Sequence, residues 1–109
     1  MTIKEFEENY CLHDSELTNL EYDSVTQTAT VTIDFCSSER GAITANFQNV
    51  SKLKYDEDKG HGEFGNTILE TQISEDGSFI FKQMDDDISD YYETIIKAEN
   101  VEVTELDNQ

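Results

Sequence analysis

The feature that most constrains the fold is the two-residue alternation of apolar and polar side chains in TATVTIDFC, residues 28–36. Ala29, Val31, Ile33 and Phe35 fall on one side of this stretch, and threonines and an aspartate fall on the other. Alternate residues of an extended chain point to opposite faces of a sheet. The pattern therefore predicts a strand with one face in a core and the other toward solvent.

Similar short patterns lie on both sides of this strand, separated by glycine and small polar residues. Such residues favour tight turns, so strands that are adjacent in the chain are predicted to pair. The stretch 66–74 also fits a single helical turn. The stretch 50–55 fits a continuation of the preceding strand after a bulge at Asn49. The further predicted strands are 17–22, 42–48 with its continuation 50–55, 66–74 and 77–84.

Residues 85–98 fit both a helix and a strand. A strand would alternate at Tyr92, Thr94 and Ile96. A helix would instead bury Ile88, Tyr92, Ile95 and Ile96. The β-branched and aromatic residues of this segment favour the strand.

A short sequence similarity within the chain supports the same interpretation. FQNV at 47–50 resembles AENV at 98–101. In both places a strand would reach an Asn, kink there and continue as a strand, in the second case through Val101 and Val103.

The N-terminal segment, residues 2–9, predicts a short helix. Thr2 and Glu5 have the spacing of a capping box, in which each residue bonds the backbone N–H of the other. Ile3 and Phe6 would face inward, and so short a helix must dock on the sheet to be stable.

A chain of 109 residues fits one domain, residues 1–109. The predicted fold class is α+β and mainly β: an antiparallel meander sheet of six or seven strands with one or two short helices. No strand–helix–strand spacing repeats, which favours an antiparallel sheet over a parallel one. Proline is absent, and acidic side chains are therefore predicted to protect the edge strands.

Charge is the strongest compositional signal: 25 acidic residues against 7 basic ones leave a net charge of −18. Residues 1–55 hold nine acids and four bases, giving −5, and residues 56–109 hold sixteen and three, giving −13. Such a charge repels nucleic acids and anionic membranes. It attracts basic protein surfaces and speeds association with them. Solubility alone is the alternative explanation.

The sequence predicts a cytoplasmic protein. No apolar segment of signal-peptide type follows Met1, and no apolar run is long enough to span a bilayer. The two cysteines, Cys11 and Cys36, would stay reduced in that compartment, although a disulfide between them is conceivable.

The His13–Asp14 pair is the obvious candidate for chemistry. Together with His61 it could supply three metal ligands, which makes a metal-dependent enzyme one alternative. The simpler prediction is a structural corner made of His13, Asp14 and Ser15. Asp14 and Ser15 would accept hydrogen bonds from nearby backbone N–H groups, and His13 would bury its ring and bond a carbonyl. No catalytic residue, metal or other cofactor is predicted.

Three stretches, LHDSELTNLEYD, ATVTIDF and ITANFQNVSKLK, carry a family resemblance. An aliphatic–His–Asp–Ser opening leads into a two-strand hairpin and then a Phe–x–Asn–Val strand. In this the chain resembles a broad group of small bacterial proteins that includes immunity protein family 50. The resemblance covers about residues 11–55. It implies a binding protein rather than an enzyme, because such proteins neutralise toxins by masking them.

The expected partner is therefore a basic protein, such as a nuclease toxin whose phosphate-binding surface an acidic face would mimic. Tyr91 would be an aromatic anchor within a charged rim, and on a strand only one of Tyr91 and Tyr92 can face outward. The alternative function is a structural domain that self-associates as a homodimer through a sheet edge. The predicted partner-binding residues are Asp56, Glu57, Asp58, Asp85, Asp86, Asp87, Asp90 and Tyr91.

Overall fold

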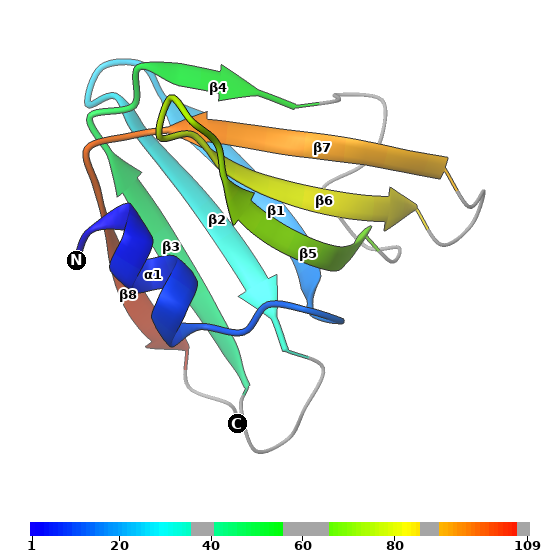
Figure 1. The fold of residues 1–109 in the computed structure, drawn as a ribbon. Coiled ribbons are helices and arrows are strands. Elements are labelled where there is room, and N and C mark those ends of the chain that lie inside the picture. Colours follow the sequence, from blue (N-terminus) through cyan, green and yellow to red (C-terminus); the bar gives the residue numbers. More distant parts are fainter. Residues whose placement is uncertain (36–40, 56–65, 86–89, 107–109) are drawn as a thin grey trace.

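The computed structural model describes residues 1–35, 41–55, 66–85 and 90–106 (Figure 1). These residues form one short helix and an antiparallel sheet of eight strands. The prediction of a mainly β, antiparallel fold with short helical content is confirmed. The helix is α1 (Ile3–Asn9), and the strands are β1 (Glu16–Asp23), β2 (Thr28–Asp34), β3 (Ala42–Gln48), β4 (Lys52–Lys54), β5 (Asn66–Ile73), β6 (Phe79–Asp85), β7 (Asp90–Lys97) and β8 (Asn100–Leu106).

Helix α1 begins with the predicted capping box. The backbone N–H of Glu5 donates to Thr2 Oγ1 at 3.0 Å, and the Thr2 N–H donates to Glu5 Oε1 at 2.9 Å. The backbone hydrogen bond from Thr2 lowers the pKa of the Glu5 carboxyl. Ile3 and Phe6 are buried, as their spacing predicts. In the described part of the chain, no helix is long and apolar enough to cross a membrane.

The sheet consists of two four-stranded parts in the order β4-β7-β6-β5-β1-β2-β3-β8. We call β1, β2, β3 and β8 half-sheet A, and β4, β5, β6 and β7 half-sheet B. The strands of the two half-sheets run in clearly different directions (Figure 1). They are joined where β1 pairs with β5 at Glu16 and Thr67.

Two chain passages join the half-sheets again, from β3 to β4 and from β7 to β8. They lie side by side, because Ser51 N–H donates to the Lys97 carbonyl at 2.8 Å and Glu99 N–H donates to the Gln48 carbonyl at 3.0 Å. Asn49 Nδ2 also donates to Glu99 Oε2 at 2.9 Å. The FQNV and AENV segments therefore cross between the two half-sheets side by side.

The prediction that 50–55 continues the preceding strand after a bulge at Asn49 is wrong. Asn49 has a φ of 55°, which turns the chain out of half-sheet A. Only Lys52–Lys54 form a strand, and this strand pairs with β7 at the far edge of the sheet. Its position depends on contacts with β7 that alternation within 42–55 does not encode.

The core lies between the two half-sheets and is rich in phenylalanine. Phe6 of α1 contacts Phe47 of β3 and Phe79 of β6, with ring centroids 5.8 and 5.4 Å apart. Phe47 and Phe79 also face each other at 6.0 Å, and Phe81 stacks edge-on beside Phe79 at 4.9 Å. These four rings are almost completely buried. The helix therefore joins the half-sheets through aromatic packing as well as covering them.

The segment 85–98 is a strand in its described part, since β7 begins at Asp90 and β8 follows at Asn100. Thr94 and Ile96 of β7 are buried, and so is Val101 of β8. The predicted alternation of strands is confirmed here, and the helical alternative is wrong.

Candidate functional site

Tyr91 is the predicted partner-binding residue whose side chain the structure describes. Its ring is 69% exposed at the start of β7, while Tyr92 is partly buried. Of the other predicted residues, Asp85 and Asp90 pair through their backbones at the ends of β6 and β7. The remaining ones, Asp56, Glu57, Asp58, Asp86 and Asp87, lie outside the described residues. The candidate site is accordingly built around Tyr91.

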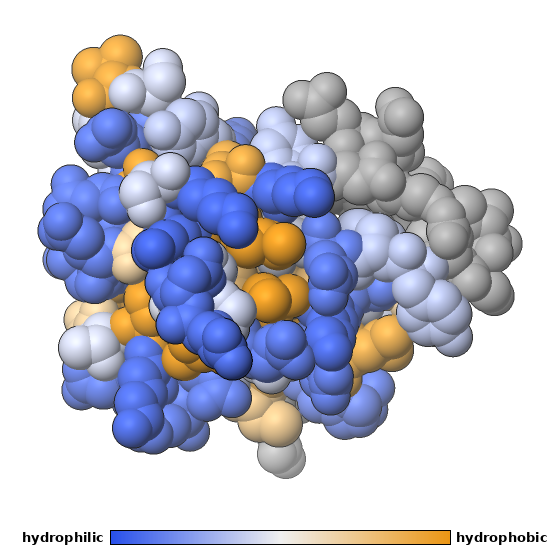
Figure 2. Space-filling model, turned by 45° about the horizontal axis from the view of Figure 1, so that its top comes forward, coloured by the Kyte–Doolittle hydropathy of each residue, from blue (hydrophilic) through white to orange (hydrophobic). Residues whose placement is uncertain are grey.

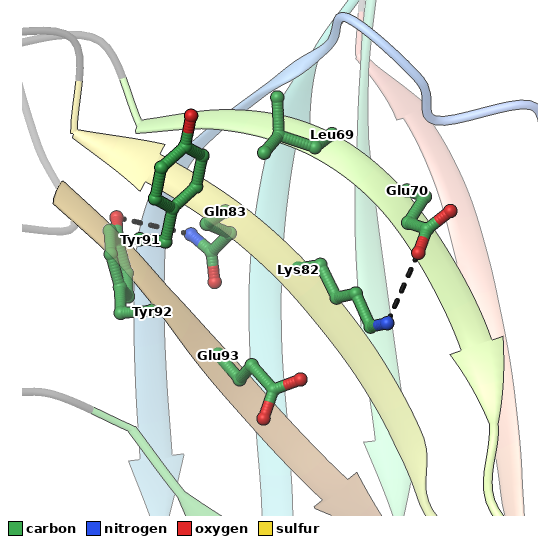
Figure 3. A pocket seen from close by; sticks show the side chains of 7 residues that line it. All are labelled: Leu69, Glu70, Lys82, Gln83, Tyr91, Tyr92 and Glu93. Atoms are coloured by element: carbon green, nitrogen blue, oxygen red, sulfur yellow. Dashed lines mark hydrogen bonds and ion pairs between the residues drawn. The ribbon is translucent and has the colours of Figure 1, made fainter. Parts of the chain in front are cut away.

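Tyr91 lines a surface hollow of about 600 Å³ on half-sheet B (Figure 3). We call this the Tyr91 hollow. The Tyr91 ring of β7 stands beside Leu69 of β5. The charged side chains of β5, β6 and β7 lie farther along the hollow. The other lining residues are Glu70, Lys82, Gln83, Tyr92 and Glu93.

A row of alternating charges crosses three strands along the hollow. Glu70 of β5 is the register partner of Lys82 of β6, which in turn faces Glu93 of β7. Lys82 Nζ lies 3.1 Å from Glu70 Oε1. Glu93 is exposed and forms no ion pair with any residue that the structure describes. We call these three residues the Glu70–Lys82–Glu93 row, and its one available carboxylate is that of Glu93.

A buried polar chain lies beneath the hollow. Thr94 Oγ1 donates to Gln83 Oε1 at 2.5 Å, and Gln83 Nε2 donates to Tyr92 Oη at 3.3 Å. Gln83 and Thr94 are almost completely inaccessible to solvent. Because both ends of the Gln83 amide have partners, this chain fixes the orientation of β6 against β7. Sequence reasoning missed it, although Gln83 has the same parity as the inward Phe79 and Phe81.

A β-bulge shapes one wall of the hollow. The pairing of β5 with β6 shifts in register between Ile68 and Glu70, so that Leu69 is the extra residue. A bulge bends its strand and changes the direction of the side chains around it. It therefore sets how Leu69 and Glu70 lie against the hollow. The sequence contains no signal for this bulge beyond the apolar run at Ile68 and Leu69.

The His13–Asp14–Ser15 corner lies directly against the bulge. The His13 ring donates from Nδ1 to the Leu69 carbonyl, and Asp14 N–H donates to the Ile68 carbonyl at 2.8 Å. Ile68 N–H donates in return to the Ser15 carbonyl at 2.7 Å. The corner thus attaches the start of half-sheet A to β5 of half-sheet B.

The corner differs in two respects from the expectation. The His13 side chain is 62% exposed rather than buried, with Nε2 3.3 Å from Asp14 Oδ2. Ser15 Oγ is buried and accepts no hydrogen bond among the described residues. The backbone supplies the contacts instead, and Asp14 has a φ of 66°, which short polar residues tolerate. The stabilising role of this corner stays a prediction.

A second hollow, of about 390 Å³, adjoins the first because Leu69 and Glu70 line both. The end of α1 and the segment after it form the opposite side, with Glu7, Glu8 and Tyr10. Acidic and aromatic side chains therefore surround the bulge on both sides.

The described part of the chain contains no arrangement of side chains that fits the alternative of a metal site. His61 lies outside it, and among residues 1–35, 41–55, 66–85 and 90–106 no three His, Cys, Asp or Glu side chains are grouped to hold a metal ion. Cys11 is exposed, and Cys36 lies outside the described residues.

Comparisons with protein-family models, curated proteins and solved structures find no match for this chain. The resemblance to immunity proteins therefore stays a prediction. The assignment of a function depends on the surface chemistry of the molecule.

Proposed function

We propose that this protein is a non-catalytic binding protein that captures a basic protein partner on half-sheet B, as an immunity protein masks a toxin. The observation that carries the proposal is the Tyr91 hollow, which a largely exposed aromatic residue lines together with surface carboxylates. Aromatic anchors within a polar rim are typical of protein interfaces. The proposal places the protein in the cytoplasm of a bacterium.

The distribution of charge supports a basic partner. None of the acidic side chains that the structure describes is buried. Figure 2 shows a face on which hydrophilic residues prevail and hydrophobic ones emerge only in small areas between them. A net charge of −18 on so small a surface attracts cationic proteins over distances beyond contact. The association rate of such a pair falls as salt screens the charges.

The two adjoining hollows supply a continuous contact area for that partner. Glu7 and Glu8 lie on one side of the bulge, and Glu70 and Glu93 lie on the other. Lys82 is the only lysine or arginine among the described lining residues of the two hollows, and it is already paired with Glu70. A cationic partner therefore meets mostly acceptors at this surface.

The test begins with the genes that neighbour the gene for this protein, because immunity proteins are encoded next to their toxins. A neighbouring gene for a basic protein is expected, and co-expression with this chain should suppress the toxicity of that protein. Purified, the two proteins should bind with an association rate that falls steeply with ionic strength. Neighbouring genes without a basic product, or binding indifferent to salt, would contradict the proposal.

A matched pair of charge reversals locates the surface. Glu93→Lys lies in the Tyr91 hollow, whereas Glu102→Lys makes the same change at an exposed position of β8 in half-sheet A. Glu93→Lys should weaken the complex about tenfold, which corresponds to about 1.4 kcal/mol. Glu102→Lys should change it by no more than its effect on net charge. Equal losses would place the contact elsewhere.

A further inference from the structure

We infer that the Tyr91 hollow recognises an arginine side chain of the basic partner, with the guanidinium stacked on the Tyr91 ring and bonded to the Glu93 carboxylate. This inference rests on the proposed function and names the group that the site binds. It combines an aromatic face and an available carboxylate, which are the two partners that a guanidinium takes at once.

The spacing on β7 brings these two partners to the same face. Tyr91 and Glu93 are two residues apart on one strand, so their side chains project to the same side, about 7 Å apart along the strand. Figure 3 shows both side chains, with the Glu93 carboxylate pointing toward Lys82 rather than toward the ring. An arginine side chain, which is long and ends in a planar group, can span this separation.

A comparison with Tyr22 shows why the spacing matters. Tyr22 of β1 is also exposed and also has acidic neighbours in the chain, Glu21 and Asp23. These acids are its immediate neighbours on an extended strand, and they therefore project to the opposite face. Tyr22 has an aromatic ring in an acidic sequence but no carboxylate on its own face from the adjacent positions. It is the natural control.

Lys82 decides which carboxylate is open to the partner. Its ammonium is bound to Glu70 at 3.1 Å, and Glu93 is left as the acceptor. Lys82 also repels any further cation that enters the row. Guanidinium has an advantage over ammonium here, because it is less strongly hydrated and offers a flat face to the ring. The preference for arginine over lysine therefore comes from the Tyr91 ring and the weaker hydration of guanidinium, because Lys82 repels both cations alike.

The site is held in shape before a partner arrives. Gln83 and Thr94 are buried and bonded to each other beneath the hollow, and the bulge at Leu69 is attached to His13. A preorganised site loses less conformational entropy on binding. A volume of about 600 Å³ accommodates the arginine side chain together with part of the chain that carries it.

The first experiment titrates the isotope-labelled protein with the peptide acetyl-Gly-Arg-Gly-amide and follows its amide signals by NMR. Saturable shifts are expected at Tyr91 and Glu93 in the millimolar range. The lysine peptide should bind several-fold more weakly, and the citrulline peptide, which has the same shape without the charge, should give no saturable shift. Equal binding of the citrulline peptide, or shifts that map to Tyr22 instead, would overturn the inference.

Single substitutions then test each contact. Tyr91→Phe retains the ring and should keep the affinity for the arginine peptide, whereas Tyr91→Ala should lower it about threefold. Glu93→Gln should have an effect of the same order. Lys82→Met should raise affinity for both peptides, because it removes a positive charge that repels either cation. Tyr22→Ala is the control and should leave binding unchanged.

The results also separate this inference from the proposed function. If Tyr91→Ala and Tyr22→Ala have equal effects while the salt-sensitive complex with the basic protein persists, arginine recognition is wrong and partner capture stands. If the arginine peptide binds as expected but no salt-sensitive protein complex exists, the proposed function is wrong and the site itself stands.

Discussion

The two half-sheets use the same antiparallel pairing but place their polar groups differently. In half-sheet A, β2 directs Ala29, Val31 and Ile33 into the core, and a polar pair, Thr30 and Asn46, lies only partly buried on the other face. In half-sheet B the polar pair is in the interior, and charged residues cross the outer face in the Glu70–Lys82–Glu93 row.

The register shifts of the two half-sheets can be compared in the same way. Each half-sheet has one within its described strands, between Leu17 and Asn19 in half-sheet A and between Ile68 and Glu70 in half-sheet B. At the first, the Thr18 hydroxyl donates to the Thr32 carbonyl at 3.3 Å within half-sheet A, whereas the second lies beside the Tyr91 hollow and is bonded by the side chain of His13 from outside its strand. Both half-sheets thus contain a bulge, but among the described residues only the bulge of half-sheet B borders the Tyr91 hollow.

The strongest test of this contrast is whether the half-sheets unfold separately. Phe6→Ala removes the ring that contacts both Phe47 and Phe79, and should lower the free energy of unfolding by about 3–5 kcal/mol. Denaturant unfolding measures the loss, and hydrogen exchange shows which strands open. Because the rings form one core, both half-sheets should lose protection together. Val25→Ala, at a 90% exposed position, is the control. Loss of protection in only one half-sheet would show independent units.

A smaller effect is expected when the same threonine-to-valine substitution is made in each of the two polar pairs. Thr94→Val removes the donor to Gln83 in the interior, and should cost about 1–3 kcal/mol because the Gln83 oxygen is left buried without a partner. Thr30→Val removes the donor to Asn46, whose oxygen can still reach water, and should cost less than about 1 kcal/mol. Thermal unfolding measures both. Equal losses would mean that the interior pair is not sealed from solvent.

A double substitution sharpens the comparison. Combining Thr94→Val with Gln83→Met removes both members of the interior pair, and should recover much of the stability lost in Thr94→Val alone. A double variant whose loss equals the sum of the single losses would indicate that the two residues contribute independently, without the coupling that their hydrogen bond predicts.

The sequence predicted half-sheet A better than half-sheet B for a physical reason. Strands β2 and β3 bury one face and expose the other, so their alternation reports the structure directly. The capping box of α1 is likewise local. The position of β4, the bulge at Leu69 and the exposure of Tyr91 depend on which strands are neighbours in the sheet. Alternation within one strand carries no information about sheet order.

The candidate site, too, could be predicted from the sequence only in part. Parity predicts that one of Tyr91 and Tyr92 faces outward, but the choice between them comes from the pairing of β7 with β6. Gln83 could have been found, because a glutamine at the parity of Phe79 and Phe81 requires a buried partner. The Glu70–Lys82–Glu93 row could not, since its members are far apart in the chain and meet only through strand register.

A weaker effect is expected at the corner that joins the half-sheets. His13→Ala removes the hydrogen bond to the Leu69 carbonyl, and should lower stability by about 0.5–1.5 kcal/mol, a modest loss because the ring is largely exposed. Hydrogen exchange should quicken locally at Ile68 and Glu70. Asn19→Ala, at an exposed position of β1, is the control. An unchanged melting temperature would show that the backbone contacts of Asp14 and Ser15 suffice.

The smallest effect concerns pH, at the turn between β5 and β6. The Ser74 hydroxyl and the Ser78 N–H donate hydrogen bonds to Asp76, and these hold the pKa of its carboxyl well below the usual range. Above the pKa of an unfolded aspartate, about 3.9, the carboxylate is ionised in both states and its stabilisation is fully present. Below that pH the unfolded chain binds the proton first, so this stabilisation is lost as the pH falls toward the folded pKa.

The prediction is tested by the difference in stability between the unsubstituted chain and Asp76→Asn across this acid range. That difference should shrink as the pH falls. Lys52 Nζ lies 3.9 Å from Asp76 Oδ2, so salt should weaken the effect only slightly beside the hydrogen bonds. A difference that grows in acid would mean that the turn prefers the protonated carboxyl.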